Sequence, residues 1–313
     1  MVGGEKMTKM FISKTKKENH LKIKSSLGEK VFRICNVLLL LLMMVTMIYP
    51  IWHVICASFS DANFLNSHTG ILLFPKKLSL NAYKMMINNP MIISGYANTL
   101  FIVTVGTTLN LIMTSLGAYF LSRKNVRYQK IVMVMIVITM YFSGGMIPFY
   151  FTVTGLGLQN SLWAIILPTM ISTYNLIIMR SSFISIPTEL EEAAKIDGAG
   201  HLRILVSVIL PCSKSILAVM FLYYAVANWN AWFNAMLFLD DRAKYPLQLV
   251  LREILIQNDT TSMTQGVGGM DVNAVGETIK YAVIVVATLP ILCVYPFIQK
   301  YFVSGTMIGA VKG

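Results

Sequence analysis

Residues 187–211 read Pro187-Thr-Glu-Leu-Glu-Glu-Ala-Ala-Lys-Ile-Asp-Gly-Ala-Gly-His-Leu-Arg-Ile-Leu-Val-Ser-Val-Ile-Leu-Pro211. Apolar segments long enough to cross a bilayer lie on both sides of this stretch. Four of the 14 acidic residues of the chain fall between Glu189 and Asp197. A connection this charged and this rich in helix-forming residues favours a docking surface over a simple turn.

The composition indicates an all-α polytopic membrane protein. Apolar residues make up 56% of the chain and charged residues only 13%, whereas a soluble domain has about 25% charged residues. The apolar runs predict six transmembrane helices, at about residues 35–57, 98–121, 131–151, 162–183, 213–229 and 278–302. The net charge of +12 does not indicate a nucleic-acid partner, because the basic residues collect at the ends of the apolar segments.

Two of the predicted spans have special features. The first is predicted to be an uncleaved anchor, because a long basic region precedes it and no small-residue cleavage site follows. That basic region, residues 1–33, is expected to be a cytoplasmic tail, in solvent or in contact with anionic lipid. The third span contains Ser143-Gly144-Gly145 and Pro148, which should loosen or break its helix.

The distribution of positive charge gives the topology. With the amino terminus inside, the inner segments hold 19 Lys and Arg residues and the outer segments hold seven. Positive charge prefers the cytoplasmic side, so both termini and the 187–211 loop are predicted to be cytoplasmic. Residues 230–277 then form a long outer segment, in which residues 246–257 have the pattern of a short amphipathic helix.

The loop also contains residues that typically begin and end short helices, and they predict two such helices. Thr188 and Glu191 have the spacing of a capping box, and Gly198 can end the first helix in a left-handed conformation. A second helix is expected from His201, and the two alanines of the first helix should leave a shallow surface on which another protein can dock.

The same residues resemble the signature of a known family. That signature is Glu-Ala-Ala, three residues, Gly, nine residues and Ile-x-Leu-Pro, and here it reads Glu192-Ala193-Ala194, Gly198 and Val208-Ile-Leu-Pro211, with Val in place of the first Ile. Over roughly residues 33–313 the chain resembles the permease subunits of binding-protein-dependent ATP-binding-cassette (ABC) importers. The resemblance implies a type I permease fold with a cytoplasmic coupling helix.

Other segments resemble the carbohydrate-importing branch of this family. They are Asn228-Trp229-Asn230-Ala-Trp232-Phe-Asn234 and the carboxyl end, residues 299–313. Residues 141–148 and 245–253 resemble the permeases that import complex oligosaccharides in Gram-positive bacteria. An oligosaccharide importer in the plasma membrane of such a bacterium is therefore expected.

The resemblance also implies partners. They are a second permease subunit, two cytoplasmic ATPase subunits that each receive a coupling helix, and an extracellular lipid-anchored sugar-binding protein. The chain has no Gly-x-x-x-x-Gly-Lys-Ser/Thr loop, so it is expected to bind no cofactor and to leave ATP and Mg to the ATPase subunits. Neither a metal site nor a disulfide framework is predicted, because the four histidines and four cysteines are scattered.

The candidate site residues form two groups. By resemblance, the residues that couple to the ATPase are Glu192, Ala193, Ala194, Asp197 and Gly198. Aromatic faces and amides suit a sugar pathway, and the available residues are Tyr141, Tyr150, Asn175, Tyr224, Asn228, Trp229 and Trp232. These aromatic residues could instead be membrane-belt or packing residues.

Several alternatives remain open at this stage. Residues 236–277 could meet the binding protein or could fold back on the chain as a lid. The signature does not encode the cargo, so a permease for another solute is the nearest alternative. A membrane enzyme or a stand-alone channel is a more distant one, because the spans hold no Asp or Glu and no His-Glu-x-x-His motif.

Overall fold

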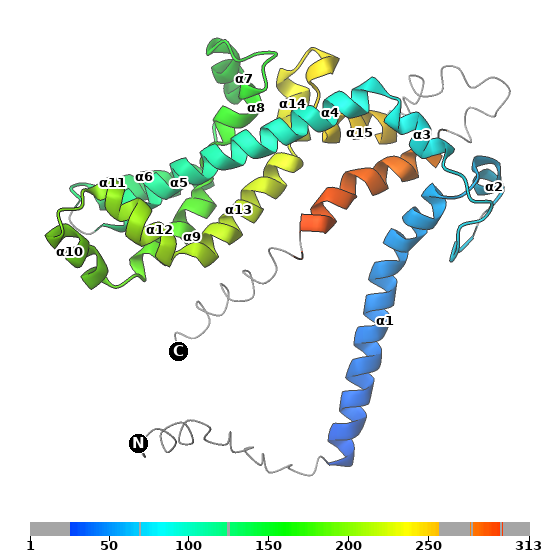
Figure 1. Cartoon of the computed structure of the whole chain (residues 1–313), viewed down its shortest axis with the longest axis horizontal. Coiled ribbons are helices and arrows are strands. Elements are labelled where there is room, and N and C mark those ends of the chain that lie inside the picture. Colours follow the sequence, from blue (N-terminus) through cyan, green and yellow to red (C-terminus); the bar gives the residue numbers. More distant parts are fainter. Residues whose placement is uncertain are drawn as a thin grey trace, which may run out of the picture. The chain divides into compact units, whose positions relative to one another are not determined.

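The computed structural model describes residues 26–68, 70–123, 126–256, 276, 278–294 and 296, and every regular element among them is a helix (Figure 1). The prediction of an all-α chain is therefore confirmed. The chain divides into two parts, residues 1–51 and residues 52–313, and each is described by itself.

The first helix crosses the junction between the two parts. Helix α1 (Leu27–Ser58) is 32 residues long, contains Pro50, and includes the predicted span 35–57. In the second part, its last turn buries Cys56 and Ala57 against Leu72. The indole nitrogen of Trp52 donates a hydrogen bond to the Leu73 carbonyl oxygen at 2.8 Å. Two short helices, α2 (Ala62–Ser67) and α3 (Asn81–Ile87), follow in the connection to the next long helix.

The second apolar helix is longer than the predicted 98–121. It runs from Pro90 to Ser122 as α4 (Pro90–Phe101), the π-helical turn η1 (Ile102–Gly106) and α5 (Thr107–Ser122). The helix includes the predicted span and begins eight residues before it, because Asn89 caps the helix and Pro90 suits its first turn. Asn98 lies inside the helix and does not cap it. Its side-chain nitrogen instead donates hydrogen bonds to another segment, at the carbonyl oxygens of Ala243 and Tyr245.

The third predicted span is not one helix. Helices α6 (Gln129–Tyr141) and α7 (Met146–Gly155) meet at an angle of 116°. The break lies at the two glycines where the sequence predicts it, and Gly145 has φ of +87°, which favours glycine. The predicted span 162–183 is bent. It consists of α8 (Trp163–Ile166), η2 (Leu167–Thr169) and α9 (Thr173–Ile184), with a bend of 48° after Pro168.

The loop of the family signature consists of α10 (Thr188–Ile196), α11 (His201–Ile204), the π-helical turn η3 (Leu205–Ile209) and α12 (Leu210–Cys212). A bend of 89° then leads into α13 (Lys214–Trp229). Helices α5, α9 and α13 pack against one another (Figure 1). The loop therefore leads directly into α13, which packs on α5 and α9.

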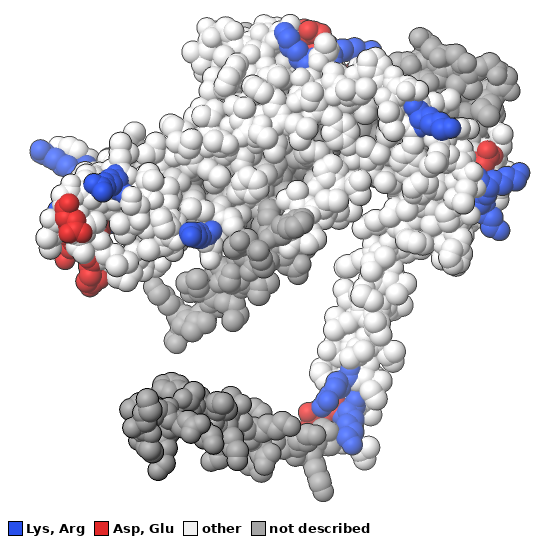
Figure 2. Space-filling model, in the orientation of Figure 1, with Lys and Arg blue, Asp and Glu red and all other residues white. Residues whose placement is uncertain are grey.

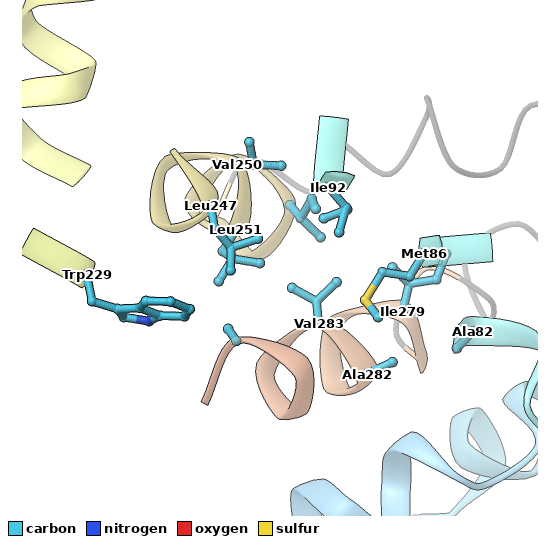
Figure 3. Packing of buried hydrophobic residues seen from close by; sticks show 12 residues of the cluster. Ala82, Met86, Ile92, Trp229, Leu247, Val250, Leu251, Ile279, Ala282 and Val283 are labelled. Carbon is cyan, nitrogen blue, oxygen red and sulfur yellow. The ribbon is translucent and has the colours of Figure 1, made fainter. Parts of the chain in front are cut away.

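The described portion of the outer segment folds back on the chain. It contains α14 (Trp232–Phe238), η4 (Arg242–Lys244) and α15 (Leu247–Ile256), while residues 257–275 lie outside the described residues. Figure 3 shows Leu247, Val250 and Leu251 of α15 packed with Ile92 of α4 and Val283 of the helix Thr278–Val294. Of the two roles considered for this segment, its described portion has the contacts of a segment packed on its own chain.

Length and composition allow several membrane crossings. Two described helices are long and apolar enough to cross a membrane, Leu27–Ser58 and Pro90–Ser122, and up to five can cross if each of the three bent pairs is one span. The helix Thr278–Val294 is shorter, and the end of its predicted span, residues 297–302, lies outside the described residues. The six-span topology stays a prediction.

Candidate coupling loop and translocation pocket

Helix α10 is fixed to the end of α5 by a buried carboxylate. Glu191 is 6% exposed, and it forms ion pairs with Arg123, the residue after α5, and with Lys195, whose Nζ lies 3.0 Å from Oε1. The capping box predicted for Thr188 and Glu191 is therefore wrong. Thr188 is the first residue of the helix, after Pro187, and the Glu191 carboxylate binds cations because a charge this buried needs a charged partner.

Arg123 is held by the end of its own helix. Its guanidinium lies 4.7 Å from the centroid of the Tyr119 ring, and its Nε donates to Ser122 Oγ at 3.2 Å. Burial lowers the pKa of Arg123, and the nearby Tyr119 raises it. The Tyr119 hydroxyl in turn lies 3.3 Å from Nδ1 of His201, the first residue of α11. Both helices of the loop therefore contact the end of α5.

The turn between the two helices has the conformation that the sequence predicts. Gly198 has φ of +78°, and the amide of Ala199 donates to the carbonyl of Ala194 at 2.9 Å. Ala194 is half-buried and packs against the cluster that contains Ala118 and Tyr119. Ala194 is therefore partly covered by its own chain, and its predicted role in docking stays a prediction.

The other candidate coupling residues lie on the surface. Glu192, Ala193, Asp197 and Gly198 are all exposed. Figure 2 shows the acidic side chains of this region gathered over α10. The exposed part of the signature is thus a small, acidic surface on a helix whose opposite side is anchored by Glu191.

A pocket of about 300 Å³ lies where α9 and α13 meet the start of the outer segment. Its lining is dominated by amides, hydroxyls and aromatic rings without a charged side chain, and consists of Thr169, Ser172, Asn175, Tyr224, Ala227, Asn228, Asn230, Ala231, Phe233 and Asn234. Three of the seven predicted pathway residues, Asn175, Tyr224 and Asn228, are among them. The volume and lining suit a ligand with many hydroxyl groups.

The wall of this pocket is a connected set of hydrogen bonds. The amide nitrogen of Asn228 donates to Thr107 Oγ1 at 3.1 Å and to Asn110 Oδ1 at 3.0 Å. Asn110 donates in turn to the carbonyl oxygens of Thr169 and Met170 at 2.9 and 2.8 Å. The pocket is therefore pre-formed, because buried amides with satisfied partners keep one orientation.

A second contact to the same wall comes from Tyr224. Its hydroxyl oxygen lies 2.7 Å from Thr114 Oγ1 of α5 and accepts from the backbone amide of Ser172 at 3.1 Å. Sequence reasoning did not assign Thr107, Asn110 or Thr114 to the pathway. Polar residues spaced along one face of α5 were the signal that could have identified them.

The other four predicted pathway residues do not line the pocket. Trp229 is buried in the apolar cluster between α15 and the helix Thr278–Val294 (Figure 3). Trp232 lies under the Arg252 guanidinium, 4.5 Å from its ring centroid, and Tyr150 stacks on Phe238. Tyr141 is 77% exposed at the end of α6. The structure does not bring these four into the pocket, because each is held by, or exposed on, another element.

A family model decides the class of this chain. The model of the binding-protein-dependent transport system inner membrane component matches residues 112–307. The chain belongs to this family. The match includes the α10 loop and the pocket-lining helices α9 and α13. The chain is thus the membrane component of a binding-protein-dependent transport system, as its signature predicts.

Two relatives from Bacillus subtilis (strain 168) are similar over nearly their whole length. Protein LplC is 42% identical, over 91% of this chain and 96% of its own. The polygalacturonan/rhamnogalacturonan transport system permease protein YtcP is 43% identical, over 88% of this chain and 96% of its own. These matches support the predicted resemblance to permeases of Gram-positive bacteria.

A solved structure supports the fold. A chain from the crystal structure of a bacterial ABC transporter involved in the import of the acidic polysaccharide alginate superimposes with a TM-score of 0.83 and 32% sequence identity, covering 89% of this chain and 99% of that chain. The prediction of an ABC importer permease fold is confirmed.

Proposed function

We propose that this chain is one of two permease subunits of an ATP-driven importer of an oligosaccharide. The single observation that carries the proposal is the pocket of about 300 Å³ lined by four asparagines, Tyr224 and hydroxyl side chains. Hydroxyl-rich ligands are recognised by amides that can both donate and accept and by aromatic faces. The pocket is then this chain's portion of the pathway.

The similar proteins support this class of cargo. YtcP is named for transport of polygalacturonan and rhamnogalacturonan, and the structural neighbour belongs to a transporter of alginate. We infer a fragment of an acidic polysaccharide as the cargo. The described lining of the pocket carries no Lys or Arg, so the amides Asn175, Asn228, Asn230 and Asn234 would supply the donors to an acidic sugar.

The exposed face of α10 is the proposed contact to an ATPase subunit. Glu192 and Asp197 give this face its negative charge, and Ala193 leaves room for a close approach. Gly198 ends the helix in a conformation that favours glycine. ATP and Mg would be bound by the ATPase subunits, and hydrolysis would take place there.

The remaining assembly follows the same reasoning. A second permease subunit would complete the pathway, and an extracellular lipid-anchored protein would deliver the sugar. Both termini would face the cytoplasm of the cell, in line with the excess of basic residues in the predicted inner segments. Because Glu191 anchors the loop from its other side, the outward face of α10 stays free for the ATPase.

The experiment is to identify the cargo directly. The complex is purified from its native membrane together with its binding protein, and the bound glycan is released and analysed by mass spectrometry. We expect the bound glycan to be an oligosaccharide fragment of an acidic polysaccharide. Recovery of an amino acid, a peptide or a metal chelate in its place would reject an oligosaccharide importer.

A further inference from the structure

Two residues join the coupling loop to the helix that forms the pocket wall. Glu191 of α10 is 6% exposed and pairs with Arg123 at the end of α5. Because a buried ion pair is directional and costly to break, it resists relative movement of the two helices more strongly than apolar contacts, which slide. A displacement of α10 is therefore transmitted to α5.

Helix α5 makes specific contacts with the pocket at its other end. Thr114 contacts the Tyr224 hydroxyl at 2.7 Å, and Asn110 and Thr107 accept from Asn228 at 3.0 and 3.1 Å. Both Tyr224 and Asn228 line the pocket. A shift of α5 along its axis must therefore move or break the hydrogen bonds that fix these two side chains.

We propose that Glu191 and Arg123 are positioning residues that transmit the movement of the coupling loop to α5, which passes it to the pocket through Thr114–Tyr224 and Asn110–Asn228. The inference rests on the proposed function, since the loop moves only if an ATPase drives it. It assigns a role to Glu191, the residue before the family signature, and to Arg123, which lies far from the signature in sequence.

The test uses the whole purified complex in lipid nanodiscs. The four native cysteines are replaced by serine or alanine, and an environment-sensitive fluorophore is attached at A227C, a pocket-lining position. The readout is the change in emission when ATP and vanadate are added. ATPase content, ATP hydrolysis and thermal unfolding are measured on the same samples.

The variants are Glu191→Gln, Arg123→Gln and the double substitution, with Glu189→Gln as the matched control. Glu189 lies on the same helix and is exposed. We expect the emission change of each single variant to be at least about fivefold smaller than that of the wild type, which is the lower end of the range for coupled sites. The control should keep the wild-type emission change. The double variant should regain thermal stability, because no buried charge is left unpaired, and should still lack the emission change.

The outcomes separate the link from a purely structural role. If the double variant regains both stability and the emission change, the pair only stabilises the fold and the proposal is overturned. The same holds if the single variants keep the full emission change. If the wild-type complex contains no ATPase or shows no ATP-dependent change, the proposed function fails, and the link fails with it.

Discussion

The hydroxyl oxygens of Thr114 and Tyr224 lie 2.7 Å apart in the interior, although the residues are separated by 110 positions in the sequence. This contact joins α5 to α13 beside the pocket. The Tyr224 hydroxyl also accepts from the backbone amide of Ser172. A single side chain thereby connects α5 and α13 with Ser172, the residue that caps α9.

Replacing Tyr224 with Phe should destabilise the protein. The change leaves the Thr114 hydroxyl and the Ser172 amide without this partner, and a buried polar group without a partner costs about 1–3 kcal/mol. The neighbouring Tyr223 is exposed, so Tyr223→Phe is the control and should change the free energy of unfolding little. Thermal unfolding of both variants in detergent decides the point, and equal midpoints would contradict the assigned role of the hydroxyl.

Replacing Gly106 with Ala should disturb the pocket wall. A Cβ at this position would lie 3.0 Å from Nδ2 of Asn228, which already donates to Thr107 and Asn110. We expect a lower rate of uptake in the reconstituted transporter, because Asn228 must move. Gly155→Ala is the control, since a Cβ there meets nothing within 4 Å. Similar losses in both variants would show that the close approach at Gly106 has no importance.

Replacing Gly198 should impair coupling through the backbone rather than through a clash. A Cβ there would meet no atom within 4 Å, but φ is +78°, a conformation that costs most residues about 1–2 kcal/mol. Gly198→Val should abolish uptake while the binding protein still captures its sugar. Gly198→Asn should keep more uptake than Gly198→Val, because Asn tolerates this conformation. Equal uptake by the wild type and Gly198→Val would reject the turn as a requirement.

The pocket residues and the remaining aromatic candidates should differ in their effect on transport. Asn175→Ala removes a pocket amide and should lower the initial rate of uptake of the glycan found on the binding protein. Tyr141→Ala changes a side chain that is 77% exposed and does not line the pocket, so it should have a smaller effect. Uptake assays in proteoliposomes test this order. The reverse order would place the pathway elsewhere.

Local features of the fold could be predicted from the sequence because local rules control them. The break before Met146 and the turn at Gly198 both follow from the conformations that glycine adopts. The family signature similarly depends on residues close together in the chain, Glu192 to Pro211. These features were therefore predicted at the correct positions.

Features that depend on distant partners could not be predicted. Nothing in the sequence pairs Glu191 with Arg123, so Glu191 was interpreted as a capping residue instead. Asn228 and Asn230 flank Trp229, and apolar residues surround Tyr224, yet Trp229 turns into the apolar cluster and Tyr224 into the pocket. Which face of α13 meets which helix is set by packing, and one sequence does not specify it.

The measurement that tests the account most directly is co-purification of an ATP-binding-cassette ATPase with the tagged chain. The wild type is compared with Ala193→Arg, which places a long charged side chain on the exposed face of α10 and should change stability little. We predict that the wild type retains the ATPase and that Ala193→Arg loses it while its thermal unfolding is unchanged. An equal yield of ATPase with both chains, or none with the wild type, would contradict the proposal that ATP-driven motion enters through this loop.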